Sequence, residues 1–211
     1  MQEGIRQHKK MSRYKSIVLT AEHLFLESGI DAVQMQDIAL AEGIGIATLF
    51  RYFPKKEKLI VAVAIQNLER MLTQLNEIVQ SSKTAYERLE ELLNYLLLNQ
   101  TNEKNASKFR EAFESYASFV KEPLADIGLY IDVQKEITQS LLPIIEDGIS
   151  DGSLRTDIPI KETIITIINT YGTFGNNVLL KTPITYIEED FKPEIQLRIL
   201  KDILLSYVKP V

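Results

Sequence analysis

The chain has 211 residues, enough for one large domain or two small ones with a hydrophobic core. It contains no cysteine, which excludes disulfides, thiolate metal sites and thiol catalysis. Its longest apolar run, residues 59–65, is too short to cross a bilayer, and its polar, basic N-terminus lacks the hydrophobic segment of a secretory signal, so we expect a cytoplasmic protein with no membrane partner.

The net charge of −5 divides unevenly along the chain. Residues 1–60 carry nine Lys and Arg against seven Asp and Glu, a balance of +2, whereas residues 61–211 carry fifteen against twenty-two, a balance of −7. The positive charge begins in an N-terminal arm, which could follow a phosphate backbone, reach into a minor groove, or be a solvated disordered tail. The basic residues of this arm are Arg6, Lys9, Lys10, Arg13 and Lys15.

Residues 34–59 predict a helix-turn-helix that runs into a third helix, after a longer helix at residues 14–28. Ile38 would face the core of the first short helix, Gly43 would end it in the left-handed conformation, and Leu49 would seat the second short helix. Polar and small residues remain for the outer surface, as a recognition helix and its neighbour need in order to enter a major groove. These outer residues are Gln36, Ile46, Ala47, Thr48, Arg51 and Tyr52.

Four segments of this region resemble, in order and spacing, the DNA-binding signature of the TetR family of bacterial repressors. They are Asp37-Ile38-Ala39, Gly43-Ile44, Thr48 to Phe53, and Lys56 to Leu59. A helix-turn-helix followed at once by an aromatic pair, a proline and a Lys-Glu-x-Leu helix start is more specific than a bare helix-turn-helix.

The resemblance implies an all-α protein with two domains. An N-terminal three-helix helix-turn-helix DNA-binding domain with a basic arm would occupy residues 1–60, and a C-terminal helical ligand-binding and dimerisation domain would occupy residues 61–211. The implied function is a ligand-responsive transcriptional regulator. It would be a repressor that binds a palindromic double-stranded DNA operator as a homodimer and is released by a small apolar or aromatic effector.

The roles of the DNA-binding residues follow from their chemistry. Gln36 can pair bidentately with adenine and Arg51 with guanine, whereas Lys56, at a helix N-terminus, suits a phosphate. Thr48 and Tyr52 carry hydroxyls that can also reach the phosphate backbone.

Three residues depart from the family pattern. Gln34 stands where the family usually has a Thr or Ser cap, Gly45 replaces the usual Ser, and Phe50 replaces a frequent Tyr. These changes remove groups that could hold phosphate. The alternative function is therefore a helical dimer that binds a ligand or a protein partner and has little DNA affinity.

The rest of the chain is predicted to be helical. Thr84 and Glu87 form a capping box at a helix start, and Pro143 is expected to kink a long helix. In chain order we predict helices at residues 55–79, 84–96, 109–120 and 124–149, a polar loop at 101–107 and a turn at 151–157.

The last two predicted helices, residues 160–180 and 191–208, carry apolar side chains around too much of their circumference for one core. A second buried face implies a partner, and the resemblance implies a four-helix bundle shared with a second subunit. The alternative is a larger intramolecular core. The residues expected at the homodimer interface are Ile164, Ile168, Tyr171, Ile199, Leu200 and Ile203.

The resembling family binds a small-molecule effector in its C-terminal domain. Such a site needs a cavity among helices, lined mostly by apolar and aromatic groups. Aromatic residues at helical spacing are also ordinary core residues, so both roles stay open for each candidate. The candidate effector-binding residues are Phe109, Phe113, Tyr116, Tyr130, Tyr171 and Phe174.

The sequence contains no catalytic constellation. Its two histidines, His8 and His23, lie in the arm and the first helix and do not form a metal-binding pair. There is no phosphate loop, GxGxxG or GxSxG motif, and adjacent carboxylates such as Glu90-Glu91 are typical of a solvated face. We therefore expect no enzymatic activity, no cofactor and no metal.

Overall fold

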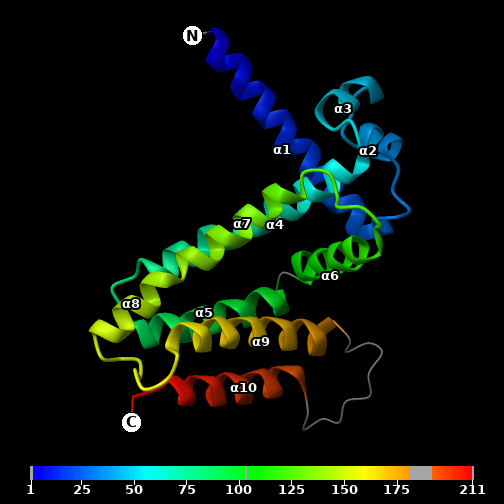
Figure 1. Cartoon of the computed structure of the whole chain (residues 1–211). Coiled ribbons are helices and arrows are strands. Elements are labelled where there is room, and N and C mark those ends of the chain that lie inside the picture. The colour runs from blue at the N-terminus through cyan, green and yellow to red at the C-terminus, as the bar shows by residue number, and fades with distance from the viewer. Residues whose placement is uncertain (1, 103, 181–191, 211) are drawn as a thin grey trace. The chain divides into compact units, whose positions relative to one another are not determined.

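The computed structural model describes residues 2–102, 104–180 and 192–210, which form ten α-helices and no strand (Figure 1). The predicted all-α class is confirmed. The chain divides into two compact units. Unit 1 comprises Met1–Arg70 and Lys108–Gln134, and unit 2 comprises Met71–Ser107 and Lys135–Val211. Unit 1 therefore includes chain from well beyond residue 60.

Unit 1 contains the predicted helix-turn-helix together with parts of later helices. Its elements are α1 (Gln2–Ser28), α2 (Met35–Ala41), α3 (Ile46–Tyr52), the first part of α4 (Lys56–Val79), most of α6 (Lys104–Phe119) and the first part of α7 (Ile127–Ser140).

Helix α1 begins at Gln2 rather than at the predicted Tyr14. The segment before Tyr14 contains no proline and is rich in Arg, Lys and Gln, which favour helix. Only the second half of α1 contributes to the core, through residues spaced four apart that include Ile17 and Phe25. Gly29, at φ +86°, ends the helix in the left-handed conformation that glycine adopts without strain.

Aromatic rings join α1, α6 and α7 within unit 1. The ring centroids of Phe25 and Phe109 are 6.3 Å apart, those of Phe109 and Phe113 are 6.4 Å apart, and those of Phe113 and Tyr130 are 5.0 Å apart. These separations lie within the range of favourable aromatic pairs. Residues 108–134 therefore belong to the same core as the helix-turn-helix.

Two ion pairs fix α4 within unit 1. Lys58 donates to both carboxylate oxygens of Asp126 at 2.9 Å, and Asp126 is the one non-glycine with positive φ (68°) among the described residues. Glu22 of α1, which is largely buried, accepts hydrogen bonds from Asn67 at 3.0 Å and from Arg70 at 2.5 Å. Both contacts hold the helix that directly follows α3.

Unit 2 is built on α5 (Ala85–Asn102), α8 (Leu142–Ser150), α9 (Ile160–Leu180) and α10 (Pro193–Val208). The predicted capping box is confirmed. Glu87 accepts from the backbone amide of Thr84 at 2.9 Å, and Thr84 Oγ1 accepts from the amide of Glu87 at 3.3 Å. The hydrogen bond from Thr84 lowers the pKa of the Glu87 carboxyl, since it stabilises the charged form.

Two predicted elements of this region are wrong. The polar loop at 101–107 is helical where it is described, because α5 ends at Asn102 and α6 starts at Lys104, in a segment without glycine or proline. The helix predicted at 124–149 is two helices, since α7 ends at Ser140 and Pro143 lies in the first turn of α8. A proline is tolerated in a first turn, where its missing amide is not needed.

The other boundaries agree more closely. Helix α4 begins one residue after its predicted start, and α9 has the predicted bounds. The predicted first residue of the last helix, Phe191, lies outside the described residues, and α10 begins at Pro193. The turn predicted at 151–157 contains Gly152 at φ +70°.

Candidate nucleic-acid interface

Helix α2 packs on unit 1 through one face and leaves the other exposed. Met35, Ile38 and Ala39 are buried, whereas Gln36 is exposed. At the start of α2, the carboxylate of Asp37 accepts the backbone amide of residue 34 at 2.8 Å, which satisfies one otherwise unpaired donor.

Helix α3 is anchored by a single side chain. Leu49 is completely buried, and it is the one buried residue of this helix. The predicted left-handed turn before α3 is confirmed, since Gly43 has φ +69°. The remaining side chains are left on or near the surface. Ile46, Ala47, Phe50 and Arg51 are exposed, and Thr48 and Tyr52 are partly buried.

The end of α3 is held against α1. The rings of Phe53 and Tyr14 have centroids 4.9 Å apart, and Phe53 is buried. Burial raises the pKa of the Tyr14 phenol, and the negative charges of Glu69 and Asp126 raise it further. The orientation of α3 is thus fixed at both its Leu49 anchor and its C-terminal end.

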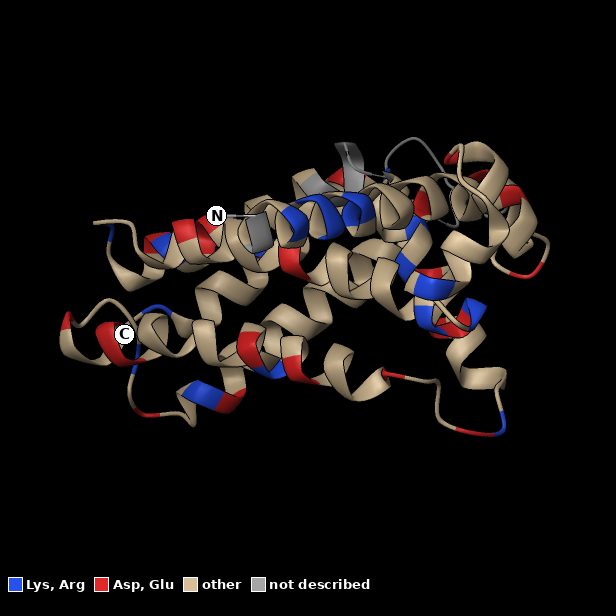
Figure 2. Ribbon diagram, turned by 90° about the horizontal axis from the view of Figure 1, so that it is seen from above, with Lys and Arg blue, Asp and Glu red and all other residues tan. Residues whose placement is uncertain are grey.

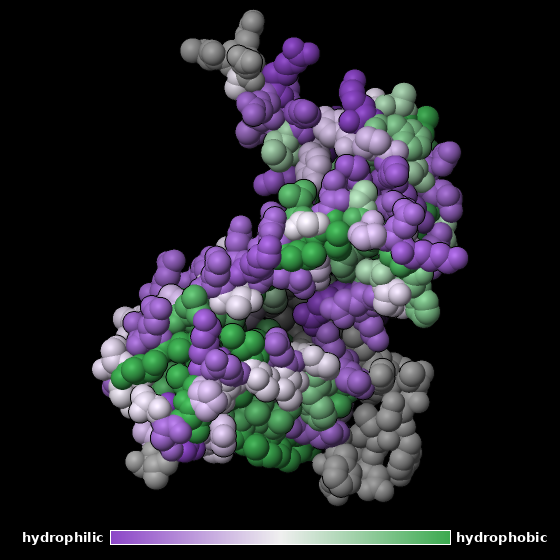
Figure 3. All heavy atoms as spheres, in the orientation of Figure 1, coloured by the Kyte–Doolittle hydropathy of each residue, from purple (hydrophilic) through white to green (hydrophobic). Residues whose placement is uncertain are grey.

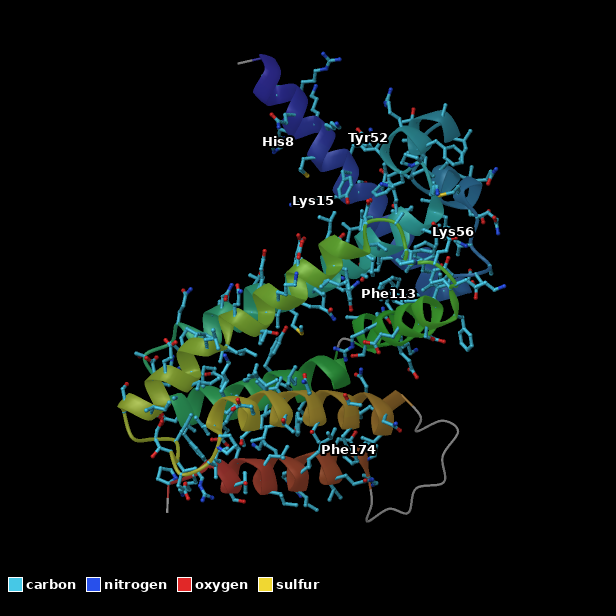
Figure 4. The ribbon with its side chains drawn as sticks, in the orientation of Figure 1. His8, Lys15, Tyr52, Lys56, Phe113 and Phe174 are labelled. Carbon is cyan, nitrogen blue, oxygen red and sulfur yellow. The ribbon has the colours of Figure 1, made fainter. Side chains whose placement is uncertain are left out.

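Lys56 is partly committed to a contact within the chain (Figure 4). Its ammonium donates to the carbonyl oxygen of Asp31 at 3.2 Å. Partial burial lowers the pKa of Lys56, and the charges of Asp31 and Asp37 oppose that shift. An ammonium has three donors, so two stay available for a phosphate. The sequence did not predict the Asp31 contact, which joins residues 25 positions apart.

The turn between α2 and α3 is linked to α1. Glu42, at the C-terminal end of α2, accepts a hydrogen bond from Thr20 at 2.7 Å and lies 3.8 Å from the guanidinium of Arg13. Both contacts help fix the position of α3 relative to α1.

The structure does not gather the six candidate effector-binding residues into one unit. Phe109, Phe113, Tyr116 and Tyr130 belong to unit 1, where three of them form the aromatic series described above. Burial raises the pKa of the Tyr130 phenol, and the nearby Glu114 adds to the shift. Tyr171 and Phe174 belong to unit 2.

The two candidates in unit 2 have different surroundings. Tyr171 is 0% exposed and lies in the core, where burial and then the charge of Asp202 raise its pKa to about 12. Phe174 instead lies on an open pocket of about 650 Å³ along α9 (Figure 4). The described lining of this pocket consists of Asn169, Thr170, Thr173, Phe174, Asn177 and Val178.

The candidate dimer residues fall on different faces. Ile164 and Tyr171 are 1% and 0% exposed in the core of unit 2. Ile168 and Leu200 pack partly against the same core. The exposed candidates are Ile199 and Ile203, at 52% and 58%.

A third exposed apolar residue of α10 is not among the predicted interface residues. Tyr207 is 53% exposed and follows Ile199 and Ile203 at four-residue spacing, so the three lie along one face of α10. Figure 3 shows hydrophobic surface over this part of unit 2. The same four-residue spacing in the sequence could have identified Tyr207.

In the described part of the chain, no group of three or more His, Cys, Asp or Glu side chains could hold a metal ion. None of the described helices is both long and apolar enough to cross a membrane.

Known proteins match both the helix-turn-helix and the whole fold. The family model of the bacterial regulatory proteins of the tetR family matches residues 17–63. The HTH-type transcriptional repressor KstR2 of Rhodococcus jostii (strain RHA1) is 27% identical over 154 residues, which are 72% of this chain and 72% of that protein. An HTH-type transcriptional regulator of Staphylococcus aureus (strain bovine RF122 / ET3-1) is 36% identical over 77 residues, 36% of this chain but only 42% of that protein.

Among solved structures, the transcriptional regulator FadR from Bacillus subtilis, in complex with stearoyl-CoA, has a TM-score of 0.71. It is 16% identical, and the match covers 92% of this chain and 99% of that one. Identity at this level shows a shared fold, so the similarity extends beyond the helix-turn-helix to both units.

Proposed function

Because the chain belongs to the TetR family of bacterial transcriptional regulators, we propose that it is a ligand-responsive repressor. It binds a palindromic operator as a homodimer and leaves it when a small apolar or aromatic effector binds. Residues 1–60 bind DNA, and residues 61–211 provide the dimer contacts and most of the effector site.

The observation that carries this proposal is the arrangement of α3. Leu49 alone fixes this short helix in the core, and contacts to α1 hold the turn before it and its C-terminal end. A rigid helix with an exposed outer face is what major-groove recognition requires. Gln36 of α2 is exposed beside it, and α2 and α3 pack directly on each other (Figure 1).

The exposed groups divide into base-reading and backbone-binding roles. Arg51 and Gln36 can each make two hydrogen bonds to a base edge, while Ile46 and Ala47 can contact a thymine methyl. Thr48, Tyr52 and the two remaining donors of Lys56 suit phosphate oxygens.

Alanine at Arg51 and at Lys56 should therefore have different effects on DNA binding. Arg51→Ala should reduce discrimination at one base pair of each half-site by about 1–3 kcal/mol. Lys56→Ala should weaken binding to every sequence alike and lower the salt dependence by about one phosphate contact per subunit. An operator is first selected by the wild type from random duplexes. The affinities of wild type and each variant are then measured by titration with this operator and with versions of it in which each base pair is changed in turn.

The thermal stability of Lys56→Ala serves as a control, because the substitution also removes the bond to Asp31. If both variants changed only overall affinity, Arg51 would not read a base. If the wild type selected no palindrome at all, the alternative of a dimeric ligand- or protein-binding module with little DNA affinity would be favoured.

Replacing Gly45 by serine, the residue that the family usually has there, should strengthen DNA binding. Gly45 caps α3 with φ −67° and ψ 144°, which any residue can adopt, and an added Cβ meets no described side chain within 4 Å. Serine would stabilise the helix start by a few tenths of a kcal/mol and return a hydroxyl for a phosphate. Gly45→Ser should raise operator affinity more than Gly45→Ala does. Equal affinities of the two variants would show that the hydroxyl makes no contact.

The effector is proposed to act through the aromatic side chains. The series of aromatic rings from Phe25 to Tyr130 begins on α1, and α1 packs on α2. A ligand that displaces Phe113 or Tyr130 therefore acts on the unit that carries α3. Bacillus subtilis FadR, which shares the fold, was solved with stearoyl-CoA, and this supports an apolar effector. The ligand can weaken operator binding only by its preference for the DNA-incompetent state, typically about 1–3 kcal/mol.

A further inference from the structure

Helix α1 extends well beyond the core of unit 1. Residues 4–16 are all exposed, and the buried positions begin at Ile17. At 1.5 Å per residue, the exposed part of the helix is roughly 20 Å long. Arg13 and Tyr14, near its end, contact Glu42 and Phe53, whereas the exposed turns before them have another use or are a solvated extension.

The positive charges of this extension lie on one side. Arg6, Lys9, Lys10 and Arg13 have the spacing i, i+3, i+4 and i+7, which places them within about 100° of the helix circumference. We call these four residues the basic face. No Asp or Glu occurs between residues 4 and 21, so nothing on the extension neutralises it. Figure 2 shows the Lys and Arg positions along this helix.

The opposite side of the helix carries much less charge. Lys15 lies about 180° from Arg6 at 100° per residue, and His8 is seven residues from Lys15 on the same side (Figure 4). The extension is therefore asymmetric in charge.

Two contacts show which way the basic face is turned. Arg13 belongs to the face, and Thr20 lies seven residues further along the same side of α1. Both approach the carboxylate of Glu42, at 3.8 Å and 2.7 Å. Glu42 lies in the turn that leads into α3, so the basic face is on the side of α1 next to the recognition helix.

From this geometry we propose that the basic face binds phosphates of the duplex that flanks the base pairs contacted by α3. The inference rests on the proposed function, since it assumes that α3 enters a major groove. Helix α1 would then contact the DNA without regard to its sequence, and the duplex covered by the protein would be longer than the base pairs that α3 contacts. The helical conformation excludes the minor groove, because a helix about 10 Å wide cannot enter a groove about 6 Å wide.

A lipid surface is the competing partner for a basic helix, and the apolar residues argue against it. Ile5, Met11 and Tyr14 are exposed, but Ile5 and Tyr14 point in opposite directions and Met11 lies between them. Insertion into a bilayer surface needs the apolar residues on one face. The extension has a basic face without an apolar face, which fits a phosphate backbone.

The test compares three proteins. The first is wild type, and the second carries Arg6→Gln, Lys9→Gln, Lys10→Gln and Arg13→Gln. The third adds His8→Lys, Met11→Lys and Ser12→Lys to those four changes, which restores most of the charge on the opposite side. Circular dichroism and thermal unfolding check that α1 stays helical, and a variant that keeps Arg13 controls for loss of the Glu42 contact.

Binding is measured first on a random-sequence duplex of about 40 base pairs over a range of salt concentrations. Each lost phosphate contact lowers the slope of log K against log salt by about 0.9, so the four substitutions should lower it by about 3–4 per subunit. The face-swapped protein should stay close to the four-substitution variant. An unchanged slope in that variant, or full recovery in the face-swapped protein, overturns the inference.

A second measurement separates this inference from the proposed function. Wild type should bind a duplex that carries its selected palindrome and flanking base pairs at least about tenfold more tightly than a duplex that contains the contacted base pairs alone. The four-substitution variant should bind the two duplexes equally. A palindrome bound equally well with and without flanks overturns the inference and leaves the function intact. If wild type selected no palindrome, the function would fail. Binding of the basic face to phosphatidylserine vesicles but not to the random duplex would assign it to a membrane instead.

Discussion

A variant with glutamate in place of both Ile199 and Ile203 is expected to be monomeric and to lose operator binding. The two side chains are 52% and 58% exposed on α10, and Tyr207 continues the same face. The opposite side of α10 is held in the core by Leu197, Leu205 and Val208. The substitutions therefore leave the subunit fold intact and act on the exposed face alone.

The expected size of this effect follows from charge burial. In a two-fold dimer each substitution occurs twice, so four carboxylates would enter an apolar contact without partners. An unpaired buried charge costs about 3–5 kcal/mol, so the dissociation constant should rise by a factor of about 1000 or more. Light scattering at micromolar concentration measures the mass, and operator titration measures the loss of binding.

Arg198→Glu is the matched control for this variant. It changes the net charge by the same amount, at an exposed position about 100° around α10 from Ile199. This control should stay dimeric. A wild-type protein that was itself monomeric, or a dimer that survived the double substitution, would place the subunit contact elsewhere.

Gly148→Ala is expected to cause a large loss of stability, although alanine favours helix. Gly148 is buried in α8, and a Cβ there would overlap Leu154 Cδ1 and come within 2.5 Å of Leu154 Cγ. Leu154 is 2% exposed in the core of unit 2 and cannot withdraw without leaving a cavity. Overpacking of this kind costs about 1–3 kcal/mol, and displacing a buried leucine costs about 2–5 kcal/mol.

Thermal and denaturant unfolding measure this loss. Gly172→Ala is the control, since a Cβ in the middle of α9 meets no described side chain within 4 Å and should stabilise the helix by about 0.5–1 kcal/mol. Adding Leu154→Ala to Gly148→Ala should remove the overlap, so the double variant should be more stable than the sum of the two single effects predicts. A stable Gly148→Ala protein would contradict the close approach of residues 148 and 154.

The helix-turn-helix could be predicted from sequence because its determinants are local. Gly43 and Leu49 specify the turn and the anchor within seven residues, and the structure has both as expected. The Pro143 prediction failed because a proline marks a disruption without saying whether the helix bends or ends. Here the chain restarts, and the proline takes a position in the first turn of α8.

The sequence could not predict which face of α9 or α10 packs against the core of unit 2. Periodicity predicted that α9 and α10 have more apolar surface than one core needs, but it could not predict that Ile164 and Tyr171 face inward while Ile203 faces outward. That choice depends on α5 and α8, which are distant in sequence. The assignment of Phe109 to unit 1 likewise depends on its contact with Phe25, 84 residues earlier in the chain.

The composition of unit 1 bears on how this regulator could be recombined with others. Its two segments, Met1–Arg70 and Lys108–Gln134, are joined by the Phe25–Phe109 ring contact and by the Lys58–Asp126 ion pair. A chimera cut after residue 60 would transplant the helix-turn-helix without α6 and would leave Phe25 uncovered. The part of the chain that could be exchanged is therefore discontinuous in sequence. A chimera designed to bind a new operator must carry both segments of unit 1, or must redesign the surface between them.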